Sequence, residues 1–192
     1  MCFVSYGTTL FIDSFERSTF QLSLLNLDSC LKTSYHAFGV IDMQTADNVA
    51  KWFLSNTRNV NNKKLQKLVY YAYAWFLTLN NESADDITNR LFENRFEAWV
   101  HGAVDPSLYN KYKIYGTKII PPCEDVSSAF SEDEIDVLRQ VNEVYGHFSG
   151  NELENICHQE TPWRNARRGL SANEPSHNPI IDADIFNCYA AR

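Results

Sequence analysis

The residues of this chain that could do chemistry are cysteines, histidines and clustered carboxylates. Cys157 and His158 are adjacent and could supply a thiolate and its base. Neighbouring residues on a helix point about 100° apart, however, so the two side chains are poorly placed for a hydrogen bond. The pattern therefore favours a buried cysteine on the apolar face of a short helix. An enzyme that uses Cys157, His158 and Glu160 stays open as an alternative.

Other catalytic and metal-binding patterns are missing from the sequence. It contains no glycine-rich phosphate loop, no H-E-x-x-H motif and no G-x-S-x-G motif. None of the five histidines lies four residues from another histidine or from a cysteine, so a zinc site would need scattered ligands. We therefore expect no catalytic residue, no metal and no cofactor.

Charged residues gather in three places. An acidic run between positions 124 and 136 contains no basic residue, and we interpret it as a solvated loop and the first turn of a helix. An acidic docking face for a basic partner is the alternative. Two basic clusters consist of Lys51, Arg58, Lys63, Lys64 and Lys67, and of Arg164, Arg167 and Arg168. Nearby aromatic residues recur at the spacing of a buried helix face, so we interpret both clusters as solvated or partner-facing surface rather than a nucleic-acid site.

The elements that position these residues are predicted to be mainly helical. A broad apolar stripe makes Lys63–Leu79 the strongest helix and places it in the core. Two S-x-x-E capping boxes, at Ser131 and Ser149, mark helix starts. Further helices are predicted from Met43, from Asp105-Pro106 to about Tyr112, from Thr161-Pro162, and over Ile180–Tyr189. The segment 95–102 reads as a short strand or as a helix that ends at Gly102, and 115–122 as extended.

Length and composition limit the remaining classes. The chain has 192 residues and a net charge of −7, so it can hold one domain, or one domain with an extension, and it lacks the basic excess of proteins that coat nucleic acid. Five cysteines without a C-x-x-C pair favour free thiols in a reducing cytosol. No apolar run approaches the roughly 20 residues of a membrane helix. We expect a soluble, cytoplasmic protein without membrane insertion.

The first 42 residues differ from the rest. They combine aromatic and β-branched residues in rough alternation and contain no proline. We interpret residues 1–42 as an N-terminal extension that contains β structure, and residues 43–192 as the main domain. A wrongly chosen start codon is the alternative explanation, and the role of the extension stays open.

Four segments, in order, resemble motifs of the Panacea domain, the SocA-like antitoxin family. Lys64–Ala72 is similar to its KLQKLLYYA-type helix, and Phe96–Val104 to its F-x-A-W-x-x-G-P-V segment. Asp105–Tyr109 looks like the V-P-x-L-Y step, and Leu153 followed by His158–Arg167 is similar to the terminal H-x-E-x-P-W segment. Alanine stands at position 103, where the family usually has proline; without the fixed φ of proline this turn is expected to be looser.

The resemblance implies a compact, mainly α domain with minor short β segments. It also implies a bacterial antitoxin, encoded by a prophage or another mobile element, that neutralises a cognate toxin from a neighbouring gene, for instance an alarmone-synthetase-like enzyme. Most members act by direct binding, whereas the SocA-like type delivers its toxin to a Clp protease. Neither route needs catalysis by the domain. A DNA-binding regulator of its own operon, using the face between Lys51 and Lys67, is a further alternative.

The expected toxin-binding residues lie in the two polar, non-periodic segments around the tryptophans, because tryptophan and arginine often anchor interfaces. For Trp99 and Trp163 a place in the core is the alternative. The predicted set is Trp99, His101, Gly102, Asp105, Tyr109, His158, Glu160, Trp163, Arg164 and Arg167.

Overall fold

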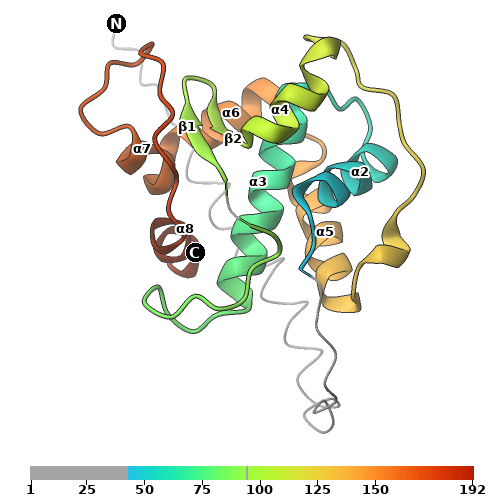
Figure 1. The fold of residues 1–192 in the computed structure, drawn as a ribbon, viewed down its shortest axis with the longest axis horizontal. Helices are drawn as coiled ribbons and strands as arrows, with labels where there is room; N and C mark the ends of the chain where they lie inside the picture. The colour runs from blue at the N-terminus through green and yellow to red at the C-terminus, as the bar shows by residue number, and fades with distance from the viewer. Residues whose placement is uncertain (1–42, 94) are drawn as a thin grey trace, which may run out of the picture. The chain divides into compact units, whose positions relative to one another are not determined.

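The computed structural model describes residues 43–93 and 95–192, drawn in colour in Figure 1. The predicted N-terminal extension, residues 1–42, lies outside the described residues. Within them the chain forms α2 (Ala46–Asn56), α3 (Asn62–Leu79), β1 (Glu97–Trp99), β2 (Gly102–Val104), α4 (Pro106–Tyr112), α5 (Glu132–Tyr145), α6 (Gly150–Gln159), α7 (Thr161–Ala166) and α8 (Asp182–Ala190). Two single 3-10 turns, η1 (Lys113–Tyr115) and η2 (Ser127–Ala129), complete the order. The prediction of a mainly α fold with minor β segments is confirmed.

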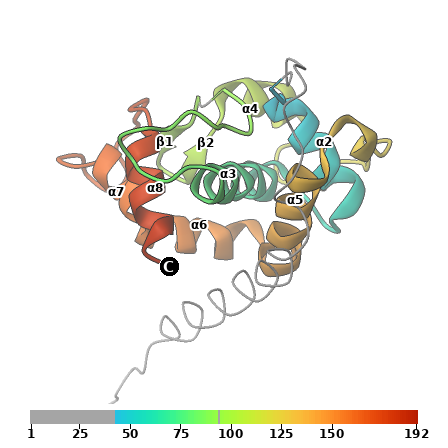
Figure 2. The same ribbon diagram turned by 90° about the horizontal axis from the view of Figure 1, so that it is seen from below.

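Helix α3 is the centre of the core. It contacts α2, α5, α6 and α8, and it lies between the α2 and α5 side and the α7 and α8 side in both Figure 1 and Figure 2. Its aromatic side chains reach both sides. Tyr71 stacks on Tyr145 of α5 with ring centroids 4.2 Å apart, and Trp75 meets Tyr189 of α8 edge-on at 5.1 Å. Residues on nearly every side of α3 are therefore buried, as its broad apolar stripe predicted.

Three helix starts form at their predicted residues. Asp105 caps α4 by accepting hydrogen bonds from the amides of Ser107 and Leu108, with proline in the first turn. Ser131 and Ser149 cap α5 and α6, and both capping boxes are complete. Because these contacts join residues two or three positions apart, local sequence is enough to specify them.

The ambiguous segment 95–102 forms the first strand of a hairpin. Strands β1 and β2 pair antiparallel in the register Glu97 with Val104, Ala98 with Ala103 and Trp99 with Gly102, which leaves a two-residue turn. The prediction of an extended segment over 115–122 is wrong at its start. There η1 is followed by a second turn, closed by the amide of Lys118 on the carbonyl of Tyr115 at 2.9 Å. Gly116, at φ +54°, joins the two turns.

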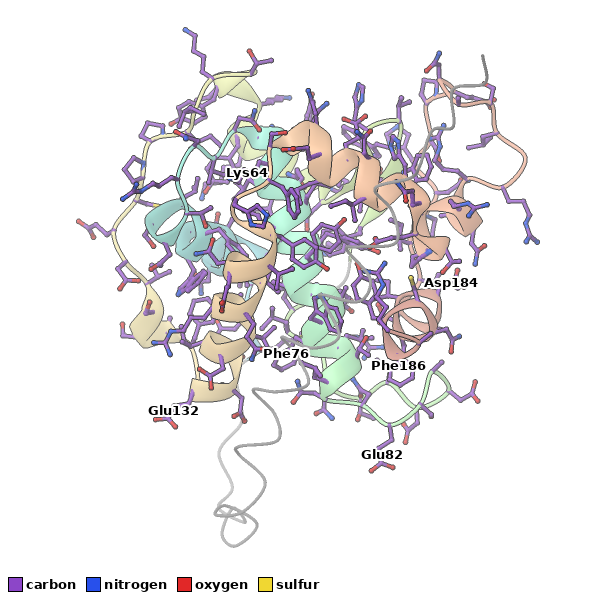
Figure 3. All side chains as sticks on the ribbon, turned by 180° about the vertical axis from the view of Figure 1, so that it is seen from behind. Lys64, Phe76, Glu82, Glu132, Asp184 and Phe186 are labelled. Carbon is purple, nitrogen blue, oxygen red and sulfur yellow. The ribbon has the colours of Figure 1, made fainter. Side chains whose placement is uncertain are left out.

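Two lysines of the first basic cluster are buried, and the interpretation of that cluster as solvated or partner-facing is wrong for both. Lys64, labelled near one end of α3 in Figure 3, donates from Nζ to the carbonyl of Gly146 at 2.6 Å and of Arg58 at 3.1 Å. Lys67 is 1% exposed and donates to the carbonyl of Ala103 at 2.7 Å. Long side chains can be buried along their stems when carbonyls receive the ammonium group. Neither lysine is available to the proposed nucleic-acid face.

Candidate functional site

The β1–β2 hairpin is held by side chains from separate parts of the chain. Ala98 and Ala103 face each other in the register and turn their amides and carbonyls away from the ladder, so their buried carbonyls need partners from outside the hairpin. Lys67 of α3 donates to Ala103 O at 2.7 Å, Trp163 Nε1 of α7 donates to Trp99 O at 2.9 Å, and Arg167 donates to Ala98 O at 3.0 Å. The segments that resemble separate family motifs therefore meet at this hairpin.

Gly102 allows the hairpin to approach α3 closely. It has φ +98°, and a Cβ built there would lie 2.6 Å from Lys67 Cε and 2.7 Å from Lys67 Nζ. Lys67 is buried and its Nζ is bonded to Ala103 O, so a shift of its side chain would disturb that hydrogen bond. Only glycine fits this position without strain.

Ala103 makes a contact that proline could not make. Its amide donates to the sulfur of Cys157 at 3.4 Å, and both residues are fully buried. Proline, which the family usually has here, carries no amide hydrogen. The amide that alanine provides at position 103 therefore has a hydrogen-bond acceptor in the Cys157 sulfur of α6.

Cys157 has the properties of a packed thiol. It is fully buried, as predicted, and burial raises its pKa to about 12. The thiol therefore stays protonated at neutral pH and is a poor nucleophile. The ring of the adjacent His158 stacks on Trp163, with centroids 4.1 Å apart.

Aromatic rings cover the outer side of the hairpin. The Trp99 ring meets Tyr109 of α4 edge-on at 4.8 Å, and Trp163 lies between His158 and the Arg167 guanidinium, which is 5.2 Å from its ring. Both tryptophans are half-buried. Each therefore combines contacts within the domain with a part of its side chain that solvent or a partner can reach.

Burial separates the ten predicted site residues into two sets. Four are buried and turned into the fold: Gly102, Asp105, Glu160 and Arg167. The other six are exposed or half-buried, and we call them the hairpin face: Trp99, His101, Tyr109, His158, Trp163 and Arg164. The toxin-binding role of all ten stays a prediction. The structure places Trp99, His101 and Gly102 in the hairpin and packs Tyr109, Trp163 and Arg167 against it, whereas Arg164 is exposed on α7 and Glu160 contacts α8.

The four buried residues hold structure in place. The carboxylate of Glu160, 3% exposed, accepts from the Tyr189 hydroxyl at 3.0 Å. Arg167 donates, besides its bond to β1, to the carbonyls of Ser171, Ala172 and Glu174. That arginine joins the loop after α7 to the hairpin.

The segment after this loop completes the outer edge of β1. The amide of Ala98 donates to Asn178 O at 2.9 Å, and the amide of Ile180 donates to Phe96 O at 2.8 Å. Beside it lies a groove of about 790 Å³ whose lining mixes apolar residues with polar ones, the latter including Arg90, Arg95, Glu97, His177 and Asp182.

Glu97 and His177 are site residues that sequence reasoning missed. One carboxylate oxygen of Glu97 accepts from Trp99 Nε1 at 2.7 Å and lies 2.7 Å from His177 Nδ1. The Glu97–His177 contact spans 80 positions, so no local spacing could have indicated it. The pair fixes the orientation of the Trp99 ring.

Glu154 is a third missed residue, and it fastens the hairpin turn to α6. It lies 2.7 Å from His101 Nδ1 and also accepts from Lys63 Nζ. Burial raises the pKa of Glu154, but the hydrogen bonds from Lys63 and His101 outweigh it and hold the pKa below its usual value. The carboxylate is therefore charged at neutral pH.

In the described part of the chain, no three His, Cys, Asp or Glu side chains are grouped as a metal ion requires. None of the helices within 43–192 is long and apolar enough to span a membrane.

The comparisons with known proteins give one positive result. A family model described as "Antitoxin SocA-like, Panacea domain" matches residues 65–164, which is just over half of the chain. No curated protein and no solved structure matches the chain. The matched range starts on α3, includes the complete hairpin and ends beyond Trp163. The chain therefore belongs to the SocA-like antitoxin family, as a protein with a Panacea domain.

Proposed function

We propose that this protein neutralises a cognate toxin protein by binding it directly through the hairpin face. An antitoxin family implies a toxin as the partner in general. The observation that carries the proposal is the division of the predicted site residues. Arg167 binds the hairpin backbone, Gly102 allows its close approach to α3, and Asp105 and Glu160 hold neighbouring helices. The remaining six are exposed or half-buried and carry aromatic, imidazole and guanidinium groups.

Such a surface suits protein recognition for two physical reasons. Tryptophan, tyrosine and arginine contribute a disproportionate share of interface energy. Rings that are already fixed, as Trp99 is by Glu97 and Tyr109, lose little conformational entropy when a partner binds.

Blocking by direct binding also needs no chemical step on the domain. The one cysteine next to a histidine is buried and protonated, which supports a binding role rather than a nucleophilic one. We therefore propose that the protein is not an enzyme.

The test pairs the full-length protein with the product of a neighbouring gene that kills cells when expressed. Rescue of growth and co-purification are measured for the wild type, Tyr109→Ala and Arg164→Glu. Each substitution should weaken the complex at least tenfold, about 1.4 kcal/mol, and abolish rescue. Arg139→Glu is the matched control, because that arginine is exposed on α5 and pairs only with the nearby Asp136 among the described residues.

Full rescue by both hairpin-face variants would contradict the proposed binding site. The toxin level in the rescued cells distinguishes the routes of neutralisation. Blocking leaves the toxin present and bound, whereas delivery to a Clp protease removes it in cells that have the protease. A gel shift of the upstream promoter at physiological salt tests the remaining alternative, regulation of the operon.

A further inference from the structure

The turn after α4 carries an unusual pair of exposed aliphatic side chains. Ile114 is 79% exposed and Ile119 is 51% exposed. Both belong to residues 113–119, which we call the cationic turn and which follow α4 at the edge of the domain in Figure 1. They are two of the five large apolar side chains exposed among the described residues, and they lie only five positions apart.

The cationic turn is rigid enough to keep these side chains exposed. The amide of Gly116 donates to Lys113 O at 3.0 Å, and the amide of Lys118 donates to Tyr115 O at 2.9 Å. Its far end is fastened to the segment before α3, where the amide of Ile120 donates to Val60 O at 2.8 Å. The isoleucines are held outward by these bonds.

Both charged residues of the cationic turn are positive. Lys113 and Lys118 are exposed, and no carboxylate among the described residues pairs with either. No acidic residue occurs in the sequence from 106 to 123. Lys111 is also close in sequence, but Asp47 already pairs with it.

We propose that the cationic turn docks this protein on the surface of an anionic lipid membrane. Lysine is depleted at protein interfaces, and their energetic centres are rich in tryptophan, tyrosine and arginine, whereas this turn offers isoleucine and lysine. Seven residues are also far fewer than the 20 to 30 that each partner gives to a standard protein interface. Apolar side chains flanked by lysines suit a lipid interface, where the former enter the acyl boundary and the latter meet the headgroups.

The net charge of −7 does not oppose this docking strongly. At physiological ionic strength the screening length is about 8 Å, so a membrane surface acts mainly on the charges nearest to it. The nearest acidic residues in sequence are Asp105, which is buried, and Glu124, which lies beyond the two prolines that end the segment. The inference is independent of the proposed toxin binding.

The test measures co-sedimentation of the full-length protein with vesicles. Phosphatidylcholine vesicles with and without phosphatidylglycerol are compared at two salt concentrations. Binding should require phosphatidylglycerol and weaken with salt. The double variant Lys113→Gln/Lys118→Gln should bind roughly 10- to 30-fold less, and Ile114→Ser/Ile119→Ser at least about tenfold less.

Two control variants match these changes elsewhere. Arg139→Gln removes one exposed cation from α5, and Ile181→Ser replaces an isoleucine of similar exposure at the start of α8. Both should bind vesicles as the wild type does. Absence of binding by the wild type, equal binding to neutral vesicles, or undiminished binding of the two double variants would overturn the proposal. Loss of toxin association in those variants without any vesicle binding would assign the turn to an acidic protein instead.

Discussion

At the residue scale, Lys67 is a buried ionisable side chain in the centre of the fold. Its ammonium group is fully enclosed, and burial lowers its pKa to about 8 from 10.5. Cys157, Glu154, Lys63 and Glu160 are the ionisable groups that act on it. A lysine in such a place weakens the fold when it is charged, although it supplies the hydrogen bond that holds Ala103 of β2.

The first prediction follows from this lowered pKa and concerns the pH dependence of stability. Between pH 8 and 10.5 the unfolded chain binds the Lys67 proton more than the folded chain does, so the free energy of unfolding should rise with pH. Relative to Lys67→Met, the wild type should gain about 2 kcal/mol from pH 7 to 9.5. Urea unfolding of both proteins at the two pH values measures this gain. Parallel curves for the two proteins would show that Lys67 keeps an ordinary pKa.

A second prediction concerns Gly102. In Gly102→Ala the new methyl group would combine a positive φ with contact to the enclosed Lys67 stem, so the loss of stability should exceed about 2 kcal/mol. Gly169→Ala is the control, because Gly169 has φ +88°, close to that of Gly102, but nothing lies within 4 Å of its Cβ position. That variant should lose only about 1 kcal/mol. Equal losses in the two variants, measured by urea unfolding, would mean that the close approach to Lys67 contributes nothing.

At the element scale, the helices and the hairpin are specified in different ways. Asp105, Ser131 and Ser149 cap helices α4, α5 and α6. Each cap bonds to amides only two or three residues away, so these helix starts could be predicted from the sequence. The hairpin depends on distant partners. Lys67 lies 36 positions from the carbonyl that it binds, and no local pattern contains that information.

Contacts between residues distant in the sequence also explain why two buried lysines were predicted to lie on the surface and why only part of the site was predicted. A run of bases without acids reads as surface until distant carbonyls, such as Gly146 O 82 positions away, are known to receive them. Trp99 and Trp163 were identified by residue type. Their direct contact, and the roles of Glu97 and His177, depend on the tertiary fold.

The third prediction tests how the hairpin is held. In Arg167→Ala the carbonyls of Ala98, Ser171, Ala172 and Glu174 lose their donor, which should cost about 2 to 4 kcal/mol. Hydrogen exchange should accelerate at least tenfold at the amides of Ala98 and Ile180, which join β1 to the segment beside it.

Arg168→Ala is the matched control for this prediction, because Arg168 is next to Arg167 in the sequence but its side chain is exposed. In Arg168→Ala, hydrogen exchange at the amides of Ala98 and Ile180 should stay within about twofold of the wild-type rate. If Arg167→Ala left both amides protected, the hairpin would be stable without its arginine.

At the scale of the whole molecule, α3 connects elements that otherwise meet little. Helices α2, α5, α6 and α8 all pack on it, and β2 contacts it as well. Figure 3 shows side chains filling the space on both sides of this helix. The domain therefore has one shared core rather than two separate halves.

The fourth prediction is that a core deletion in α3 affects all its neighbours equally. Leu68 is fully buried, and Leu68→Ala should cost about 2 to 5 kcal/mol. Hydrogen exchange measured on peptides from α2, α5 and α8 as urea rises should report the same loss in each. A large loss in α2 with α8 unaffected would show two independently unfolding halves.

The separation between buried and exposed residues at the hairpin has a consequence for how this protein can change. Lys67, Gly102 and Arg167 hold the hairpin through backbone atoms, whereas His101, Tyr109 and Arg164 contribute side chains to its surface. Replacement of Tyr109 or Arg164 breaks none of the hairpin's backbone bonds, unlike replacement of Trp163, whose Nε1 donates to Trp99 O. A lineage, or a protein engineer, can therefore exchange what the hairpin recognises while the structure that presents it stays the same.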